Sequence, residues 1–238
     1  MKKEDILTAL KELREKTPKK KFSQTIDLVI SLKEFNTKSN KVSVPVKLPY
    51  GKGKKNKICG LIDQELEAEA KKNLDFYILK ENFIEYANNK KKQKKLTSDY
   101  GFFIAQASIM TDIAKTFGKT FGPRGAMPDP KVGSVVAPVA KLGPLVEKLR
   151  DLVKVETKSE AALKCPVGKE SMKDEEIYTN IQTVYDAVIK ELPQEQNNVK
   201  DVMLKMTMGP LYVVGKGLRR TEKKEEEIVK VEEKDEKK

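Results

Sequence analysis

Hydrophobic and polar residues alternate in three segments, two near the N-terminus and one near the C-terminus. In residues 22–32 and 42–48 every second residue is apolar, with Gln24 as the exception, and residues 199–214 begin in the same way. A period of two is typical of a strand with one buried face, so each segment predicts a half-buried strand. The predicted inward positions are Phe22, Ile26, Leu28, Ile30 and Leu32, then Val42, Val44, Val46 and Leu48, and finally Val202, Leu204, Met206 and Met208.

The centre of the chain has a different pattern, in which short apolar runs alternate with helical stretches. Each run is short enough for a buried strand, and hydrophobic residues at helical spacing follow it. Such an alternation is typical of βαβ units around a parallel sheet. The predicted strands cover residues 57–63, 76–79 and 102–105, and the predicted helices cover 64–72, a stretch from Glu81, 110–117 and 145–153.

Two further helices are predicted beside the alternating segments. Apolar residues recur at helical spacing in residues 3–16, and Pro18 prevents this helix from continuing. Ser171 and Asp174 have the spacing of a capping box, which predicts the start of the second helix. Together with the alternating strands, these helices predict an α+β domain built from both ends of the chain.

The C-terminal strand region is expected to pair with strands in the first fifty residues, which makes the central part an insertion. The first domain then has an antiparallel or mixed sheet with helices on one face, and the second is α/β. Because the chain crosses between the domains twice, we predict a hinge. The final segment has mixed charge and few apolar residues, which predicts disorder. The predicted ranges are 1–51 with 151–220 for the first domain, 52–150 for the insertion and 221–238 for the tail.

Charge indicates the class of partner. The net charge is +12, and the last eighteen residues contribute −2 through eight acids and six lysines, so residues 1–220 carry +14. A body this basic indicates a polyanion, with nucleic acid ahead of an acidic membrane surface. No apolar stretch is long enough to cross a membrane and no signal peptide is evident, so we expect a cytoplasmic protein.

Composition also excludes several kinds of catalytic and metal site. The chain has no histidine, which removes catalytic triads and the commonest metal ligand. The two cysteines, Cys59 and Cys165, are too few for a zinc site and are interpreted as buried thiols. No pair of carboxylates has a spacing that suggests acid–base catalysis. We therefore expect no catalytic residue, metal or cofactor.

Two basic segments in the insertion are candidates for phosphate contact. Gly118-Lys119-Thr120 resembles part of a phosphate loop, but Ile113 stands where that motif requires glycine. The glycine- and proline-rich stretch that follows is either a rigid connection or an exposed phosphate-contacting loop. The lysine run at residues 90–95 is either a solvated helix end or a nucleic-acid contact. The candidate contact residues of the loop are Lys119, Arg124 and Lys131.

Polar residues on the outward faces of two predicted strands form a second candidate surface. Lys21, Thr25 and Asp27 lie on one strand, and Thr207 lies on the other, just before the break at Gly209. Side by side, these strands would offer hydroxyls, a carboxylate and free backbone groups. A carboxylate suits a 2′-hydroxyl or a base amino group better than a phosphate, which favours folded RNA over DNA.

Four short motifs follow one another along the chain. They are Lys21-Phe22-Ser23-Gln24-Thr25, Gly122-Pro123-Arg124-Gly125 with Met127-Pro128 and Pro130-Lys131, Pro166-Val167-Gly168-Lys169, and Thr207-Met208-Gly209-Pro210. In this order they resemble those of the large-subunit ribosomal protein L-one family in its archaeal form, over residues 3–215. Asp27 stands where a glutamate is common in bacterial members, and the charged tail lies outside the match.

The resemblance implies a non-enzymatic RNA-binding protein of the ribosome with a Rossmann-like inserted domain. Its implied partners are large-subunit rRNA, E-site tRNA, whose release the protein would assist as part of a mobile stalk, and its own mRNA, whose translation it would repress. We expect a monomer off the ribosome. The alternatives are a nonspecific basic nucleic-acid binder and a nucleotide-binding α/β enzyme. The implied RNA-contact residues are Lys21, Phe22, Thr25, Asp27, Lys169, Ser171, Thr207, Met208 and Gly209, with Lys119, Arg124 and Lys131 as secondary candidates.

Overall fold

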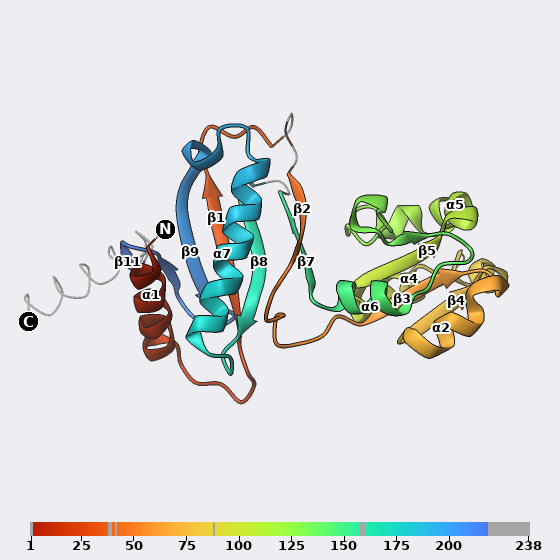
Figure 1. The fold of residues 1–238 in the computed structure, drawn as a ribbon, viewed down its shortest axis with the longest axis horizontal. Helices are drawn as coiled ribbons and strands as arrows, with labels where there is room; N and C mark the ends of the chain where they lie inside the picture. Colours follow the sequence, from red (N-terminus) through yellow and green to blue (C-terminus); the bar gives the residue numbers. More distant parts are fainter. Residues whose placement is uncertain (1, 38–39, 41, 88, 158–159, 219–238) are drawn as a thin grey trace, which may run out of the picture. The chain divides into compact units, whose positions relative to one another are not determined.

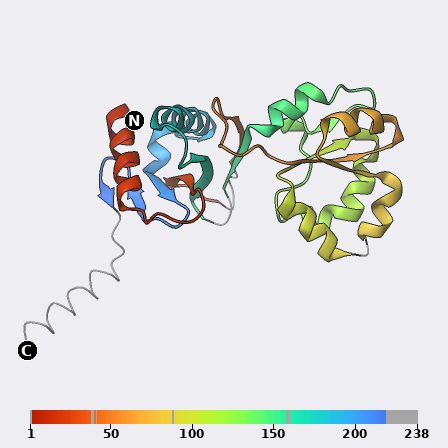
Figure 2. The same cartoon turned by 90° about the horizontal axis from the view of Figure 1, so that it is seen from below.

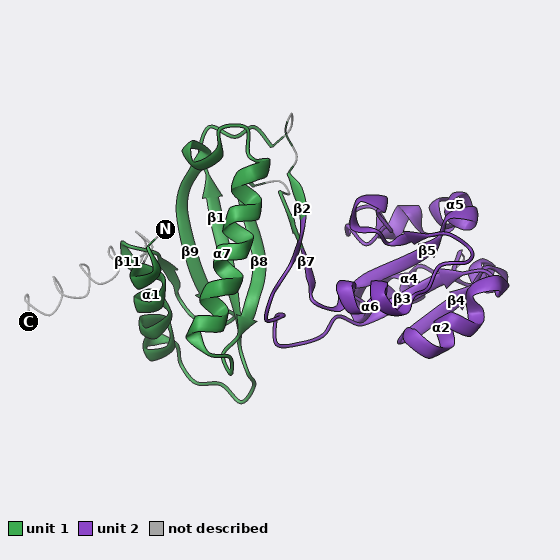
Figure 3. Cartoon of the chain, viewed as in Figure 1, with its two compact units in different colours: residues 1–44, 154–238 green, residues 45–153 purple. Residues whose placement is uncertain are grey.

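The computed structural model describes residues 2–37, 40, 42–87, 89–157 and 160–218. The chain divides into two compact units, and each is described by itself (Figure 3). Unit 1 contains residues 1–44 and 154–238, and unit 2 contains residues 45–153. The segment 221–238, predicted to be a disordered tail, lies outside the described residues.

Unit 1 is built on a five-stranded sheet that draws on both ends of the chain. β1 lies between β8 and β9 and pairs with both in antiparallel fashion, and β10 and β11 extend the sheet beyond β9. The pairing of β9 with β1 confirms the predicted partnership of the C-terminal strand with the N-terminal part of the chain. The strands are β1 (Thr25–Leu32), β8 (Ala162–Lys169), β9 (Val199–Met206), β10 (Leu211–Val213) and β11 (Gly217–Leu218).

Two helices, α1 (Lys3–Lys16) and α7 (Asp174–Glu191), cover one face of this sheet (Figures 1 and 2). Residues of β1 are alternately half-buried and buried. The buried set faces the apolar sides of the two helices. Val29 of β1 belongs to the half-buried set, and with its neighbours it lines a shallow cavity of about 560 Å³ on the sheet. The buried residues of this core include Ile6, Leu10, Leu13, Ile26, Leu28, Ile30, Ile177, Ile181, Val184 and Val188.

Unit 2 has a four-stranded sheet in which all three strand pairs are parallel. Helices cover both faces: α2 and α6 bury one apolar cluster, and α3, α4 and α5 bury another that contains Phe117 and Phe121. The βαβ prediction is therefore confirmed for this sheet. The elements are β3 (Ile58–Ile62), α2 (Glu67–Asn73), β4 (Phe76–Leu79), α3 (Phe83–Ala87), α4 (Lys90–Asp99), β5 (Phe102–Gln106), α5 (Met110–Phe121), β6 (Val135–Val136) and α6 (Gly143–Arg150), with short 3-10 turns at Gln64–Leu66, Lys80–Asn82, Ala107–Ile109, Pro130–Val132 and, in unit 1, Glu195–Asn198.

A separate two-stranded sheet joins the two passages of the chain between the units. It pairs β2 (Ser43–Lys47) with β7 (Leu152–Glu156), and the division between the units falls within each strand. The predicted inward residues of β2 are buried. Pro45 is tolerated because a two-stranded sheet consists of edge strands, where a missing N–H costs little.

Several predicted boundaries are wrong. The first strand starts at Thr25 instead of Phe22, whose side chain is exposed, and Met208 is an exposed turn residue beyond the end of β9. The second long helix starts at Asp174 instead of Ser171. The last predicted helix of the insertion ends at Arg150, so Leu152 belongs to β7. In these cases the local pattern continues past the point where tertiary pairing ends or begins.

Candidate nucleic-acid interface

Three segments of unit 1 meet at one end of its sheet. Thr25, the first residue of β1, lies opposite Lys169, the last residue of β8. On the other side of β1, the backbone N–H of Thr207 donates to the carbonyl of Thr25 over 3.1 Å. We call Thr25, Lys169, Thr207, Met208 and Gly209 the strand-end surface. The sequence predicts that the strand of Thr25 and the strand that leads to Thr207 lie side by side, and β1 does pair with β9.

The hydroxyl of Thr207 is fixed by the backbone of Thr25. It accepts a hydrogen bond from the Thr25 N–H over 3.2 Å and lies 3.3 Å from the Thr25 carbonyl, to which it donates. The Thr207 side chain is nevertheless exposed. A hydroxyl oxygen has two lone pairs, so one acceptor position remains on an oxygen whose place the Thr25 backbone fixes.

The turn after Thr207 brings main chain to the surface. The Gly209 N–H closes it by donating to the carbonyl of Met206 over 3.0 Å, and Met208 is 58% exposed. A Cβ atom on Gly209 would lie 2.6 Å from Oγ1 and 3.0 Å from Cγ2 of Thr17, which is 6% exposed. The glycine is therefore required by close packing against Thr17, the residue that follows the last turn of α1.

Gln24 holds this end of the sheet together, although it is not among the contact residues predicted from the sequence. Its side chain is fully buried. Its Oε1 accepts from the Met208 N–H over 3.1 Å, and its Nε2 donates to the carbonyl of Pro18 over 3.2 Å. Its own carbonyl accepts from the Glu170 N–H over 2.9 Å. One buried residue thus positions three segments of the candidate surface, and its sequence signals are a polar residue at an apolar position and its place in the first family motif.

Arg14 of α1 fixes the loop that carries Ser171. Its Nε donates to Asp174 Oδ1 over 2.9 Å, and its Nη2 donates to the carbonyl of Met172 over 2.8 Å. Its Nη1 donates to the carbonyl of Glu170. Ser171 is exposed at the tip of this loop. The sequence does not reveal this role of Arg14, because nothing local connects it to residues more than 150 positions away.

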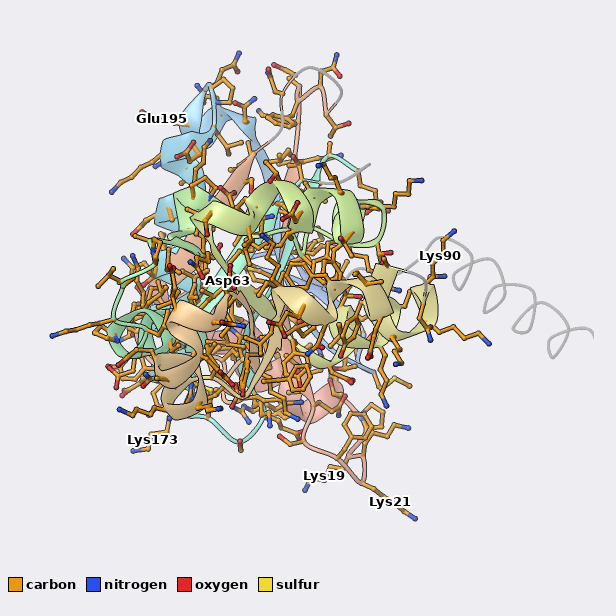
Figure 4. The ribbon with its side chains drawn as sticks, turned by 90° about the vertical axis from the view of Figure 1, so that its right-hand side faces the viewer. Lys19, Lys21, Asp63, Lys90, Lys173 and Glu195 are labelled. Carbon is orange, nitrogen blue, oxygen red and sulfur yellow. The ribbon has the colours of Figure 1, made fainter. Side chains whose placement is uncertain are left out.

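Lys21 and Phe22 lie in the loop that leads from α1 into β1. Both side chains are exposed, and Phe22 is 53% exposed. Figure 4 shows Lys19 and Lys21 projecting outward from the loop. In such a pair the cation can contact a phosphate while the neighbouring aromatic ring stacks on a base.

Asp27 lies two residues farther along β1 than Thr25, on the open face of the sheet. Its neighbours across the strands are Lys205 on β9 and Pro166 on β8. Partial burial raises the pKa of the Asp27 carboxyl, and the nearby Lys205 ammonium opposes that rise. The carboxyl lines the same shallow cavity as Lys205 and Cys165. Because the Asp27 carboxyl is already partly buried, it loses little hydration when the hydroxyl of a ligand replaces water as its hydrogen-bond donor.

Comparison with known proteins identifies the family. Residues 11–210 match the model of the ribosomal protein L1p/L10e family. The chain belongs to this family. Relatives described as "Large ribosomal subunit protein uL1" include those of Methanothermococcus thermolithotrophicus, 37% identical over 88% of this chain and 97% of the relative, and Pyrococcus abyssi, 36% identical over 88% and 94%. That of Thermoplasma volcanium is 33% identical over 90% and 97%.

Membership of the L1p/L10e family argues against one alternative raised by the sequence, the nucleotide-binding enzyme. The family consists of ribosomal proteins, so the expectation of a protein without enzymatic activity agrees with the match and the nucleotide-binding enzyme does not. All residues of the strand-end surface lie within the matched range. The archaeal resemblance inferred from four motifs is confirmed by these relatives.

The three secondary candidates of this L1p/L10e protein lie in unit 2 and differ in their surroundings. Arg124 is used within the unit, because its Nη1 donates to the carbonyl of Lys94 over 2.9 Å. Lys119 is exposed in the last turn of α5, and Lys131 is exposed in a 3-10 turn that Asp129 caps. These residues belong to a different unit from the strand-end surface. Their role in RNA contact stays a prediction.

The two thiols of this family member are buried and free. Burial raises the pKa of Cys165 to about 12 and that of Cys59 still further, so both are protonated thiols at neutral pH. Among the described residues, no group of three or more acidic or cysteine side chains could hold a metal ion. Within the same residues, no helix has the length and apolar character needed to span a membrane.

Proposed function

We propose that this protein is a structural constituent of the large ribosomal subunit that binds a folded rRNA site through unit 1. Membership of a ribosomal-protein family supports the general role, since its relatives carry the name of a large-subunit protein. The observation that supports the RNA site best is that the Thr207 hydroxyl is fixed by Thr25 on an exposed residue, where three segments meet.

In this proposal the strand-end surface recognises the shape of RNA. The Thr207 hydroxyl and the backbone carbonyls of Met208 and Gly209 would contact ribose 2′-hydroxyls, which distinguish RNA from DNA. Lys21 and Lys169 would neutralise phosphates, and Phe22 would stack on a base. Asp27 would accept a hydrogen bond from a 2′-hydroxyl or base amino group, and Ser171 would add a further hydroxyl at the edge of the surface.

We extend the proposal to the roles that the family resemblance implies. A site that reads the fold of an RNA instead of a long sequence would also bind an mRNA with the same fold, so the protein would repress its own translation. On the ribosome it would form a mobile stalk that assists release of deacylated tRNA from the E site. The domain ranges predicted from the sequence belong to this proposal, with RNA held by the discontinuous first domain.

Thr207→Val tests the site directly. The substitution keeps shape and β propensity but removes the hydroxyl, so we expect affinity for a hairpin-and-internal-loop fragment of large-subunit rRNA to fall at least about tenfold, or about 1.4 kcal/mol. The dependence of affinity on salt should be unchanged, because no charge is removed. Fluorescence titrations over a salt series would measure both quantities.

Thr207→Ser is the matched control, since it restores the hydroxyl and should recover most of the affinity. Valine at this position also leaves the Thr25 N–H without its acceptor, so thermal unfolding of both variants separates a folding defect from a defect in recognition. Equal binding by wild type and Thr207→Val, with a steep salt dependence, would mean that a nonspecific basic surface binds the RNA.

A further inference from the structure

The first helix after α3 carries a concentrated positive surface. α4 contains five lysines and one acid, Asp99, in ten residues, and all five lysine side chains are exposed. The sequence alone is compatible with a solvated helix end or a nucleic-acid contact. The structure shows that this run is a helix of its own, and Figure 4 shows Lys90 pointing outward. We call Lys90, Lys91, Lys94 and Lys95 the α4 lysine surface.

This arrangement of charge does not serve the stability of the helix. The first turn of α4 has no acid and the last turn has no base, which is the reverse of the order that the helix macrodipole favours. Lys90 and Lys94, and likewise Lys91 and Lys95, are four residues apart, where like charges repel. The N-terminus of the helix is stabilised by the Asn89 side chain, which accepts from the Lys92 N–H over 3.1 Å, and not by the lysine charges.

Ion pairs within the protein do not account for the lysines either. Elsewhere lysines pair with glutamates four residues away, as Lys71 does with Glu67 over 2.8 Å. On α4, Lys92 lies 3.9 Å from Glu85. For the α4 lysine surface no ion pair within 4 Å occurs among the described residues.

The helix is mounted rigidly. Gln93 is buried, and its Nε2 donates to the carbonyls of Tyr86 over 2.8 Å and Thr116 over 3.2 Å. Its Oε1 accepts from the Thr120 hydroxyl over 2.5 Å. Arg124 adds the bond to the Lys94 carbonyl, which gives the guanidinium a positioning role. The backbone of α4 is thus fixed on α5 while the lysine side chains are exposed to solvent.

We infer that the α4 lysine surface binds the phosphate backbone of double-helical RNA without reading its sequence. Lysine offers a point charge and no base-specific pattern, which suits phosphate contact. A membrane surface fits poorly, because a membrane-bound helix needs an apolar side to insert, and the exposed residues of α4 are lysine, serine and aspartate. The inference rests on the proposed function, since that function makes RNA the polyanion, and adds a second contact in unit 2.

The test compares two charge-matched variants of the full chain. In the first, Lys90, Lys91, Lys94 and Lys95 are changed to Gln, which keeps helix propensity. In the second, four exposed lysines elsewhere in unit 2, Lys54, Lys72, Lys141 and Lys148, are changed to Gln. Both are titrated over a salt series with a plain RNA duplex of about 20 base pairs and, separately, with the short rRNA internal-loop fragment.

We expect the α4 variant to bind the duplex at least about tenfold more weakly, and its salt slope to fall by about 0.7–0.9 for each phosphate that is no longer neutralised. The control variant should stay within about threefold of wild type. Two results would overturn the inference. One is that the control variant loses as much affinity for the duplex as the α4 variant, and the other is that the α4 variant binds the duplex as tightly as wild type. The α4 variant should melt at or above the wild-type temperature, and a lower value would contradict the premise that these lysines do not stabilise the helix.

The short fragment keeps the two proposals apart. If unit 1 does not recognise folded RNA, wild-type protein will bind fragment and duplex alike, whatever the α4 variant does. If only the α4 inference fails, wild type will still prefer the fragment, and both charge variants will bind the duplex equally.

Discussion

Gly209→Ala is expected to weaken binding of the rRNA fragment more than tenfold and to lower the free energy of unfolding by about 1–3 kcal/mol. The new Cβ would lie 2.6 Å from Thr17 Oγ1 and 3.2 Å from Met206 Cβ. Thr17 is buried, so the turn must move away from α1. The displaced turn carries Thr207 and Met208 with it, so stability and recognition fall together. Urea denaturation and RNA titration measure the two effects.

Thr17→Ala provides the control for this prediction. Thr17 Oγ1 is buried without a hydrogen-bond partner among the described residues, so its removal should cost little by itself. It also removes the two atoms closest to the new Cβ. The double variant Thr17→Ala/Gly209→Ala should therefore recover stability and affinity, giving a favourable coupling in a double-mutant cycle. Purely additive effects would show that the contact with Thr17 is not the reason for the glycine.

Gln24→Met is expected to destabilise unit 1 by about 1–3 kcal/mol, because it leaves the Met208 N–H and the Pro18 carbonyl without their partner. Methionine is close in size to glutamine, so cavity formation contributes little. The loosened turn should bind the rRNA fragment at least about tenfold more weakly. Differential scanning calorimetry and RNA titration measure these changes.

Gln93→Met is the matched control in unit 2. Gln93 is also a buried glutamine whose amide joins separate elements, so its replacement should destabilise the protein to a similar extent. It lies in unit 2, where it fixes α4 and not the strand-end surface of unit 1, so affinity for the short fragment should fall much less than in Gln24→Met. Equal decreases of affinity in both variants would show that destabilisation alone weakens binding, and would contradict a positioning role for Gln24.

The periodic parts of the chain could be predicted from the sequence. β1 and β2 each bury one face, and β9 follows the same alternation except at Met203, which is buried as well. Burial of one face enforces the alternation that reveals a strand. Most strands and helices of unit 2 could be predicted for a related reason, since strands covered on both sides must be apolar runs, but α4 and β6 were not predicted. β3 is buried at every position. The hydrophobic pattern shows which residues face a core, and the main sheet of each unit packs against such a core.

The ends of these elements could not be predicted in the same way. The apolar pattern continues to Met208 and begins at Phe22, yet both are exposed, because the strand pairing of β1 ends before it reaches them. The bond from Met208 to Gln24 joins residues 184 positions apart, and the bond from Arg14 to Met172 joins residues 158 positions apart. Patterns within a short stretch of sequence cannot predict contacts between residues so far apart in the chain. The candidate RNA-contact residues follow from motifs, whereas the residues that position them required the structure.

Methionine methyl groups offer the most direct test of RNA recognition by unit 1. Met208 is exposed on the strand-end surface and Met172 follows Ser171, whereas Met110 and Met127 pack in unit 2. NMR spectra of methyl-labelled protein titrated with the short rRNA fragment should show a large shift or broadening of Met208 and a smaller one of Met172, with Met110 and Met127 unchanged. An unperturbed Met208 at saturating RNA, with shifts confined to Met110 and Met127, would contradict the account.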